Sequence, residues 1–241
     1  MNIVPKKSLG QNFLLNEEII KQIVDLGKIT NDSIVMEIGP GTGNLTKEIL
    51  KKKPYKFMAI EKDKILFSKL KNEFNLNVEL LNQDVLKFNW EHFKNQNIIL
   101  FGNLPYNISS KLLIDWVRLS NLNCIFSKLI LMFQKEVADR IVADVNSKKY
   151  GRLTILTEWK LEAKKVMDID PENFFPKPKV KSSLVYFKPK REFFNFKNSR
   201  NLEKVTDIFF QNRRKMIKKP LNILFKDSER IIQKLKLNNS H

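Results

Sequence analysis

The sequence predicts an α/β protein, in which an open, mostly parallel β-sheet carries helices on its faces and is followed by a small helical domain. Between residues 34 and 133, short apolar runs alternate with amphipathic stretches, a pattern typical of βαβ units. Three of only seven glycines fall within residues 39–43, directly after the first apolar run. The composition turns strongly basic near residue 190, which predicts the separate domain.

Strands and helices are expected to alternate along most of the chain. The apolar runs predict strands at Ile34–Ile38, Phe57–Ile60, Val78–Leu81, Ile98–Phe101 and Leu129–Phe133. The amphipathic stretches predict helices at Leu45–Lys53, Lys64–Phe74, Ser109–Leu119, Lys135–Asp144 and Leu153–Lys160. Two further strands, near residues 163–169 and 183–187, are separated by a segment rich in proline, which must be a loop because proline cannot lie inside a central strand.

The last 52 residues differ from the rest in charge. Residues 190–241 hold 14 Lys and Arg against 5 Asp and Glu, which is half of the chain's net charge of +18. A surplus of this size favours a polyanionic partner. We therefore expect two domains, residues 1–189 and residues 190–241, with a helix at Val205–Phe225 that presents a basic face. A merely solvated terminal helix remains the alternative.

The chain is poor in residues for acid–base or metal chemistry. It has one cysteine and two histidines, His92 and His241, which argues against a disulfide framework, a metal site or a histidine-based triad. No apolar stretch approaches the roughly 18 residues of a membrane span, and the first residues lack the apolar core of a signal peptide. We expect a cytoplasmic protein that uses no metal and does not act at a membrane.

Polar residues follow the first three predicted strands. The glycine turn follows the first strand, Glu61 ends the second, and Asp84 follows the third. Ligands of open α/β sheets bind at this edge, outside the carboxyl ends of the strands. Glu61 lies 18 residues beyond the glycine turn, close to the spacing of about 20 that is typical of a carboxylate binding ribose hydroxyls. Glu37, just before the turn, favours a ligand that carries an ammonium and a sulfonium group over a phosphate.

The fourth predicted strand ends in FGNLPYNIS, residues 101–109. An Asn, a Pro without a backbone donor and a Tyr suit a compact site for a planar ring that bears an amine. Together with EIGPGTG, AIEKD and NQDVLKF, this segment closely resembles the ribosomal RNA adenine N6-dimethyltransferase family. Four more segments resemble that family, namely KKSLGQNFL, YGRLTI, FFPKPKVKSS and FFQNRRKMIKKPL. Lys181 departs from it, because the family often has an acidic residue there, and the C-terminal domain is short.

The resemblance implies a Rossmann-like class I methyltransferase fold and S-adenosylmethionine as cofactor. It implies that the Asn103 side chain and the Leu104 carbonyl accept from the adenine amine, with Pro105 holding that carbonyl outward. Tyr106 would stack on the flipped base and Phe174 would form the second wall. The implied cofactor residues are Asn12, Leu14, Glu37, Gly39, Gly41, Glu61, Asp84, Val85 and Asn103. The expected RNA contacts of the basic helix are Arg213, Arg214, Lys215, Lys218 and Lys219.

The implied reaction is dimethylation of two adjacent adenosines in a loop near the 3′ end of small-subunit (16S) ribosomal RNA. The implied partner is the pre-30S particle, and we expect a monomer. Two alternatives remain: a large-subunit adenine methyltransferase that confers antibiotic resistance, and a mainly non-catalytic ribosome assembly factor. Leu104 within NLPYN and the YGRLTI segment resemble the small-subunit enzymes, and intact Asn103, Tyr106 and Glu61 favour an active enzyme.

Overall fold

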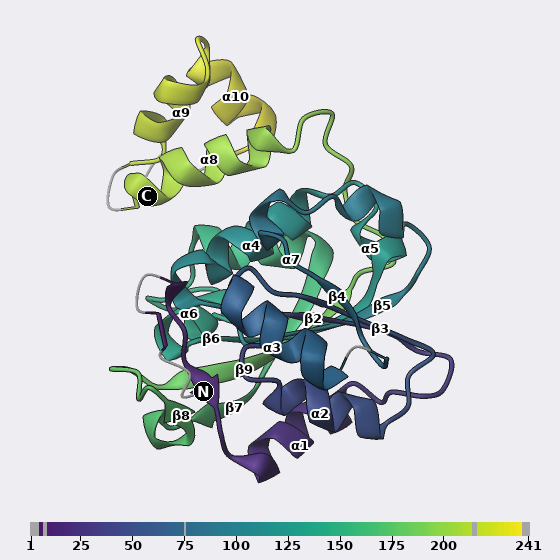
Figure 1. Cartoon of the computed structure of the whole chain (residues 1–241). Helices are drawn as coiled ribbons and strands as arrows, with labels where there is room; N and C mark the ends of the chain where they lie inside the picture. The colour runs from purple at the N-terminus through teal and green to yellow at the C-terminus, as the bar shows by residue number, and fades with distance from the viewer. Residues whose placement is uncertain (1–4, 7–8, 75, 214–215, 238–241) are drawn as a thin grey trace.

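The computed structural model describes residues 5–6, 9–74, 76–213 and 216–237. Its main body is a seven-stranded sheet in the order β4-β3-β2-β5-β6-β9-β7 (Figure 1). The strands are β2 (Ile34–Ile38), β3 (Lys56–Ile60), β4 (Glu79–Leu81), β5 (Ile98–Gly102), β6 (Phe126–Gln134), β7 (Leu161–Ile169) and β9 (Ser182–Pro189). The pairs from β4 to β6 are parallel, and β9 runs antiparallel to β6 and β7. The predicted α/β fold with a mostly parallel sheet is confirmed.

Both faces of the sheet are covered, which is why its central strands are continuously apolar. Alternate residues of one strand enter different cores: Val35 of β2 belongs to one buried cluster and Met36 to the other. The first cluster includes side chains from α1 (Glu17–Leu26), α2 (Asn44–Lys51) and α3 (Lys64–Phe74). The second includes side chains from α4 (Tyr106–Arg118), α5 (Leu122–Ile125) and α6 (Lys135–Ile141).

The helix α1 was not among the predicted elements. It begins after Asn16, whose side chain accepts from the Ile19 amide at 3.1 Å, and it has Glu17 and Glu18 in its first turn. An Asn N-cap followed by acidic residues is a recognised signal for a helix start. The signal was therefore present in the sequence.

A second, two-stranded sheet ties two distant segments together. Strand β1 (Phe13–Leu14) pairs antiparallel with β8 (Phe174–Phe175), which follows a short 3₁₀ turn, η4 (Pro171–Asn173). The Leu15 amide also donates to the Asn173 carbonyl at 2.8 Å. The pairing holds the N-terminal segment against the loop between β7 and β9.

The C-terminal residues form a helical lobe next to α4 and α7 (Arg152–Lys160) (Figure 1). The lobe contains α8 (Arg200–Gln211), α9 (Lys218–Leu224) and α10 (Ser228–Leu235). The single helix predicted over Val205–Phe225 is therefore wrong, because α8 ends at Gln211 and α9 begins at Lys218. Pro220 explains the new start: proline fits the first turn of a helix but would break the interior of a continuous one.

Ion pairs attach the lobe to the sheet domain, and aromatic contacts of Trp159 hold the connecting segment. Arg118 of α4 donates to both carboxylate oxygens of Glu203 at 2.7 Å, and Arg152 reaches Asp207 at 3.1 Å. In the connecting segment, the Phe194 carbonyl accepts from the Trp159 indole at 2.7 Å, and Phe196 packs on the same ring. None of the described helices combines the length and apolar character needed to cross a membrane.

Candidate active site

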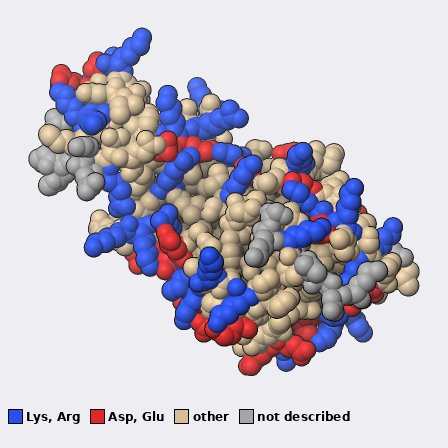
Figure 2. All heavy atoms as spheres, turned by 60° about the vertical axis from the view of Figure 1, so that its left-hand side comes forward, with Lys and Arg blue, Asp and Glu red and all other residues tan. Residues whose placement is uncertain are grey.

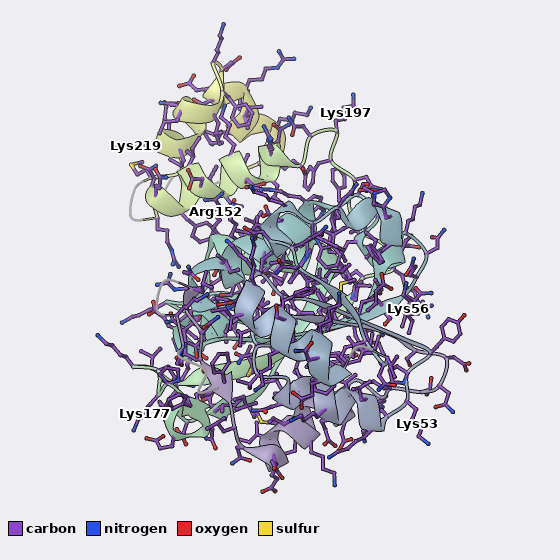
Figure 3. The ribbon with its side chains drawn as sticks, in the orientation of Figure 1. Lys53, Lys56, Arg152, Lys177, Lys197 and Lys219 are labelled. Carbon is purple, nitrogen blue, oxygen red and sulfur yellow. The ribbon has the colours of Figure 1, made fainter. Side chains whose placement is uncertain are left out.

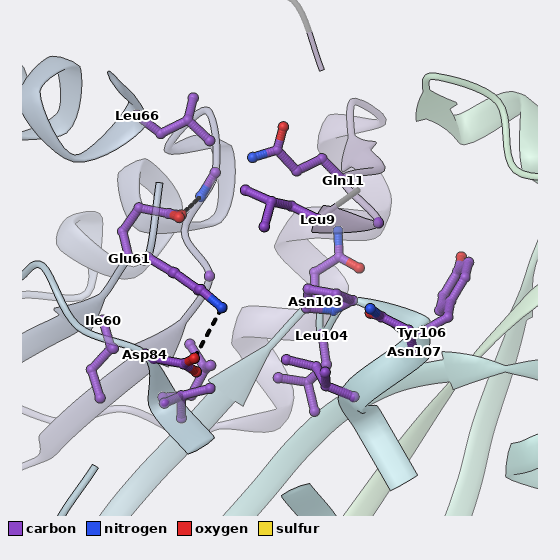
Figure 4. Close-up of a pocket in the computed structure, with 18 of the residues that line it drawn as sticks. Leu9, Gln11, Ile60, Glu61, Leu66, Asp84, Asn103, Leu104, Tyr106 and Asn107 are labelled. Atoms are coloured by element: carbon purple, nitrogen blue, oxygen red, sulfur yellow. Dashed lines mark hydrogen bonds and ion pairs between the residues drawn. The ribbon is translucent and has the colours of Figure 1, made fainter. Parts of the chain in front are cut away.

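A pocket lies at the carboxyl ends of β2, β3 and β5, where the connections leave the sheet in opposite directions (Figure 4). Open α/β sheets bind ligands in such a crevice. The cavity has a volume of about 150 Å³, and residues 9–13 of the N-terminal segment form part of its wall. Ten of the predicted site residues line it: Asn12, Gly39, Gly41, Glu61, Asp84, Val85, Asn103, Leu104, Pro105 and Tyr106.

The glycine turn brings the backbone close to the pocket. Gly39 and Gly41 have φ angles of 68° and 61°, in a region that residues other than glycine rarely adopt. A Cβ atom on Gly41 would lie 2.8 Å from the Phe13 ring. A side chain at position 41 would therefore collide with Phe13, and the two glycines leave a bare backbone cradle in the pocket wall.

Glu61 stands at the end of β3 as a buried acceptor. Its two carboxylate oxygens accept from the Asp63 amide at 2.8 Å and from the Gly41 amide at 3.2 Å. Burial raises the pKa of Glu61 above its ordinary value. An ionised carboxylate offers about four lone-pair sites, so Glu61 has acceptor capacity left for a ligand's hydroxyl groups.

Asp84 reaches the pocket from the next strand connection. It caps the 3₁₀ turn η2 (Val85–Lys87) by accepting from the Leu86 amide at 3.1 Å, and Lys62 pairs with its other oxygen at 2.9 Å. The Lys62 hydrogen bond lowers the pKa of Asp84. The carboxylate is therefore ionised and fixed in orientation on the same side of the pocket as Glu61 (Figure 4).

Asn103 and Tyr106 occupy the opposite side of the pocket (Figure 4). The Asn103 amide nitrogen donates to the Asn12 carbonyl at 2.7 Å. Because a carbonyl can only accept, this contact determines which end of the amide is the donor and leaves Oδ1 as its acceptor. Pro105 is the N-cap residue of α4, and Tyr106 begins the helix. This side of the pocket thus presents the Asn103 Oδ1 acceptor beside the Tyr106 ring.

Three predicted residues do not line the main pocket. Glu37 and Leu14 line an adjoining cavity of about 30 Å³, which shares Gly39 and Asn103 with the pocket. Phe174 is only 4% exposed and packs in a buried apolar cluster, whereas the next residue, Phe175, is 55% exposed. The base-stacking role of Phe174 stays a prediction, and its ring lies inside the protein in this structure.

Glu37 is a buried carboxyl behind the glycine turn. It accepts from the Thr46 hydroxyl at 2.7 Å, and burial raises its pKa from 4.5 to about 8. The folded-state pKa exceeds the unfolded value, so the carboxyl's contribution to stability is full below about pH 4.5. It is lost as the pH rises to about 8. Ionisation of Glu37 therefore lowers the stability of the folded protein when no cofactor is bound.

Replacing Glu37 with Gln is expected to raise the melting temperature relative to wild type, and to raise it more at about pH 8.5 than at about pH 5. Each kcal/mol of that difference corresponds to about 2–4 °C in a chain of this size. Thermal unfolding at several pH values, without cofactor, measures the effect. Glu79→Gln is the control, because Glu79 is exposed. A difference that does not vary with pH would show that Glu37 is ionised throughout.

Asp63, which is not among the predicted site residues, holds the N-terminal segment over the pocket. The buried Asp63 accepts from Gln11 at 3.2 Å and pairs with Lys6 at 2.8 Å. It also accepts from the Ile65 amide at 2.9 Å, at the start of α3. Its place two residues after Glu61 and just before a predicted helix was the available signal. The described residues contain no cluster of three or more His, Cys, Asp or Glu suited to a metal ion.

A second cleft, of about 670 Å³, lies between the sheet domain and the C-terminal lobe. Tyr150 and Phe210 line it, and Arg213 lies over the Phe210 ring at 5.3 Å. The cleft is rich in basic side chains, among them Lys111, Arg118, Arg140, Lys148, Lys149, Arg152 and Arg213. Lys and Arg side chains line both sides of this junction in Figure 2.

The predicted basic residues of the lobe are only partly described. Arg213 donates to the Lys148 carbonyl at 3.4 Å, Lys218 pairs with Glu229 at 2.9 Å, and Lys219 is exposed on α9 (Figure 3). Arg214 and Lys215 lie outside the described residues. The cleft adds basic residues from the sheet domain, such as Arg140 and Lys148, that do not belong to any charge run in the sequence of the lobe.

Comparison with known proteins identifies the family. The model of the family "Ribosomal RNA adenine dimethylase" matches residues 4–240. The "Ribosomal RNA small subunit methyltransferase A" of Pelagibacter ubique is 50% identical over 97% of this chain and 89% of its own length. The protein of the same name from Wolbachia pipientis subsp. Culex pipiens is 42% identical, again over 97% of the chain and 89% of its own length.

Solved structures agree with this result. The dimethyladenosine transferase of Plasmodium falciparum superposes with a TM-score of 0.78 at 31% identity, over 93% of this chain and 82% of its own. The 23S rRNA methyltransferase ErmE gives a TM-score of 0.70 at 22% identity, over 95% and 92%, which shows a shared fold. With the family model matching nearly every residue, the chain belongs to the ribosomal RNA adenine dimethylase family.

Proposed function

We propose that this protein transfers methyl groups from S-adenosylmethionine to the N6 amines of two adjacent adenosines near the 3′ end of small-subunit ribosomal RNA. The observation that carries the proposal is the arrangement of Asn103 and Tyr106 on one side of the pocket: an oriented acceptor lies beside an aromatic ring. The named relatives, up to 50% identical, are small-subunit methyltransferases. ErmE shares the fold at 22% identity and gives no comparable support for a large-subunit substrate.

The pocket fits S-adenosylmethionine on its own chemistry. The Gly39–Gly41 cradle would admit the methionine portion, Glu61 would accept from the ribose hydroxyls, and Asp84 with Val85 would face the adenine. Asn12 in the main pocket and Leu14 in the adjoining cavity would hold the cofactor from the N-terminal segment. When bound, the cofactor supplies an electrophilic methyl group on a positively charged sulfur. Asp84 is ionised, and its negative charge in the pocket wall suits that positively charged group.

The protein's part in the reaction is alignment. The lone pair of an adenine amine is delocalised into the ring, which makes the amine a weak nucleophile. Asn103 Oδ1 and the Leu104 carbonyl accept from the two N–H bonds and so favour a tetrahedral nitrogen. Tyr106 stacks on the base, which has left its own stack at a cost that is smallest in a loop. No strong base is needed, and such preorganised alignment is a major source of catalysis.

The proposal extends to how the RNA is held. Residues 190–241 would act as an RNA-binding domain, with the interdomain cleft and the basic face of the lobe contacting phosphates. Tyr150 and Phe210 offer ring faces inside the cleft. The partner is the pre-30S particle in the cytoplasm, and the protein acts as a monomer. A non-catalytic assembly role alone would not require the oriented Asn103 amide.

The direct test uses small-subunit particles from cells that lack this methylation. Purified protein and labelled S-adenosylmethionine are added, and the modified adenosines are located by mass spectrometry. Two neighbouring dimethyladenosines near the 3′ end are the expected products. Label found only in large-subunit RNA would overturn the substrate, and an absence of label in either RNA would favour the assembly-factor alternative.

Replacing basic residues of the lobe is expected to flatten the salt dependence of RNA binding. Each lost phosphate contact should lower the slope of log K against log salt by roughly 0.7–0.9. The test variant changes Arg213, Arg214, Lys218 and Lys219 to Gln. The control variant changes four lysines on or beside α1 and α2, helices that lie at the opposite end of the molecule from the lobe (Figure 1): Lys21, Lys28, Lys51 and Lys53. Equal slopes for the two variants would leave the lobe without a role in RNA binding.

A further inference from the structure

The ring of Tyr106 is fastened at its far end. Its hydroxyl lies 2.6 Å from the hydroxyl of Ser182, which is 76 positions away in the sequence. Ser182 is fully buried and is the first residue of β9. Burial raises the pKa of Tyr106, so the phenol is neutral at physiological pH and keeps the proton that this hydrogen bond needs.

The anchoring residue Ser182 belongs to a strand that is paired on both sides. Ser182 pairs with Gln134 of β6 on one side and with Ile169 of β7 on the other. The Lys135 amide donates to the carbonyl of the preceding Lys181 at 2.9 Å. Tyr106, by contrast, begins a helix whose N-cap, Pro105, makes no side-chain hydrogen bond to it. The bond therefore ties a side chain at a loop end to the interior of the sheet.

The hydrogen-bonded Tyr106 ring lies between two cavities. Tyr106 lines the cofactor pocket, and it also lines a cavity of about 360 Å³ that Gly10, Asn107 and Gln134 complete. A base that enters beside the methyl donor must meet this ring. The tilt of the ring then decides where the amine of the base lies relative to Asn103.

We propose that Ser182 is a positioning residue for methyl transfer: its hydroxyl holds the Tyr106 ring at the tilt that stacks the target base. The inference rests on the proposed function, because the stacked base is the adenosine that this function assigns. Without the bond, the ring turns about its Cα–Cβ bond, and base capture and amine alignment both weaken. Cofactor affinity is unchanged, because Ser182 does not line the cofactor pocket.

The next residue supplies a matched control. Ser183 is also fully buried in β9, but successive strand residues point to opposite faces, and its hydroxyl donates to Asp168 at 2.7 Å. Ser183→Ala therefore removes the same group at the same depth without touching Tyr106. A loss of activity that arises only from weakening β9 would appear in both alanine variants.

The experiment measures single-turnover transfer of labelled methyl to undermethylated small-subunit particles. Ser182→Ala and Tyr106→Phe should each lower the rate roughly three- to tenfold, the range expected for one hydrogen bond. The double variant should be no slower than either single variant, because both changes remove the same bond. Ser182→Thr should restore most of the rate, and Ser183→Ala should match wild type per folded molecule. Calorimetric titration should give the same S-adenosylmethionine affinity for wild type and for every variant.

A wild-type rate in Ser182→Ala or in Tyr106→Phe would overturn the proposal, as would two losses that multiply in the double variant. If Ser182→Ala fails to fold, Tyr106→Phe decides alone, because it leaves β9 intact. The same variants are assayed on large-subunit RNA. If the wild-type protein methylates only that RNA, the proposed substrate fails while the comparison between variants still tests Ser182.

Discussion

Replacing Asn103 with alanine is expected to lower single-turnover methyl transfer to small-subunit RNA by a factor on the order of 10² or more. The magnitude is typical of deleting one preorganised hydrogen-bonding group from an active site. The Asn12 carbonyl orients the amide so that Oδ1 is the acceptor, and alanine leaves one N–H bond of the adenine amine without a partner. Labelled methyl transfer at saturating cofactor measures the loss.

Cofactor affinity separates this mechanism from general damage to the pocket. Asn103→Ala should lower S-adenosylmethionine affinity only modestly, because the glycine cradle, Glu61 and Asp84 remain in place. Asn89→Ala is the control, because Asn89 is exposed and merely caps the 3₁₀ turn η3 (Trp90–Phe93). Near-normal dimethylation by Asn103→Ala would show that activation of the amine does not depend on this side chain.

Replacing Glu61 with alanine is expected to weaken S-adenosylmethionine binding about tenfold to a hundredfold. Charge-assisted hydrogen bonds contribute about 1.5–3 kcal/mol each, and tenfold in affinity corresponds to about 1.4 kcal/mol. The carboxylate stands at the end of β3 with acceptor capacity beyond its bonds to the Gly41 and Asp63 amides. Isothermal titration of the protein with S-adenosylmethionine gives the change directly.

Two further measurements make the Glu61 result specific. Glu79→Ala removes an exposed carboxylate from the neighbouring strand β4 and should bind the cofactor like wild type. 5′-Deoxyadenosine lacks the methionine portion but keeps both ribose hydroxyls, so its binding should weaken by a similar factor in Glu61→Ala. A normal dissociation constant for both ligands would contradict the ribose assignment.

Local patterns in the sequence predicted the sheet well. The run Ile34–Ile38 and the helix Lys64–Phe74 match the structure residue for residue, because strong apolar periodicity is a local signal. The single helix predicted over Val205–Phe225 was wrong for a local reason as well, because Pro220 is incompatible with the interior of a continuous helix. The pairing of β1 with β8 was out of reach, because two short segments far apart in sequence carry no pattern that links them.

The site residues, like the elements of the fold, were predictable where the signal was local in the sequence and not where it was distant. Residues inside a motif, such as Gly41, Glu61 and Asn103, were placed at one pocket because each follows a strand of the same parallel sheet. Partners that come from elsewhere in the chain were missed. The Asn12 carbonyl that orients Asn103 is 91 positions away from it, and Ser182 is 76 positions from Tyr106. The buried position of Glu37 was missed too, because its depth depends on how α2 packs against the turn.

The pairing of β1 with β8 also has a consequence for synthesis. Leu14 pairs with Phe174, about 160 positions later in the chain, and translation adds roughly 5–20 residues per second. The segment that covers the cofactor pocket must therefore wait roughly 10–30 s for its partner strand to be made. During that interval the nascent chain has its glycine turn and Glu61 but no finished cover. The cover over the cofactor pocket is therefore completed only late in synthesis.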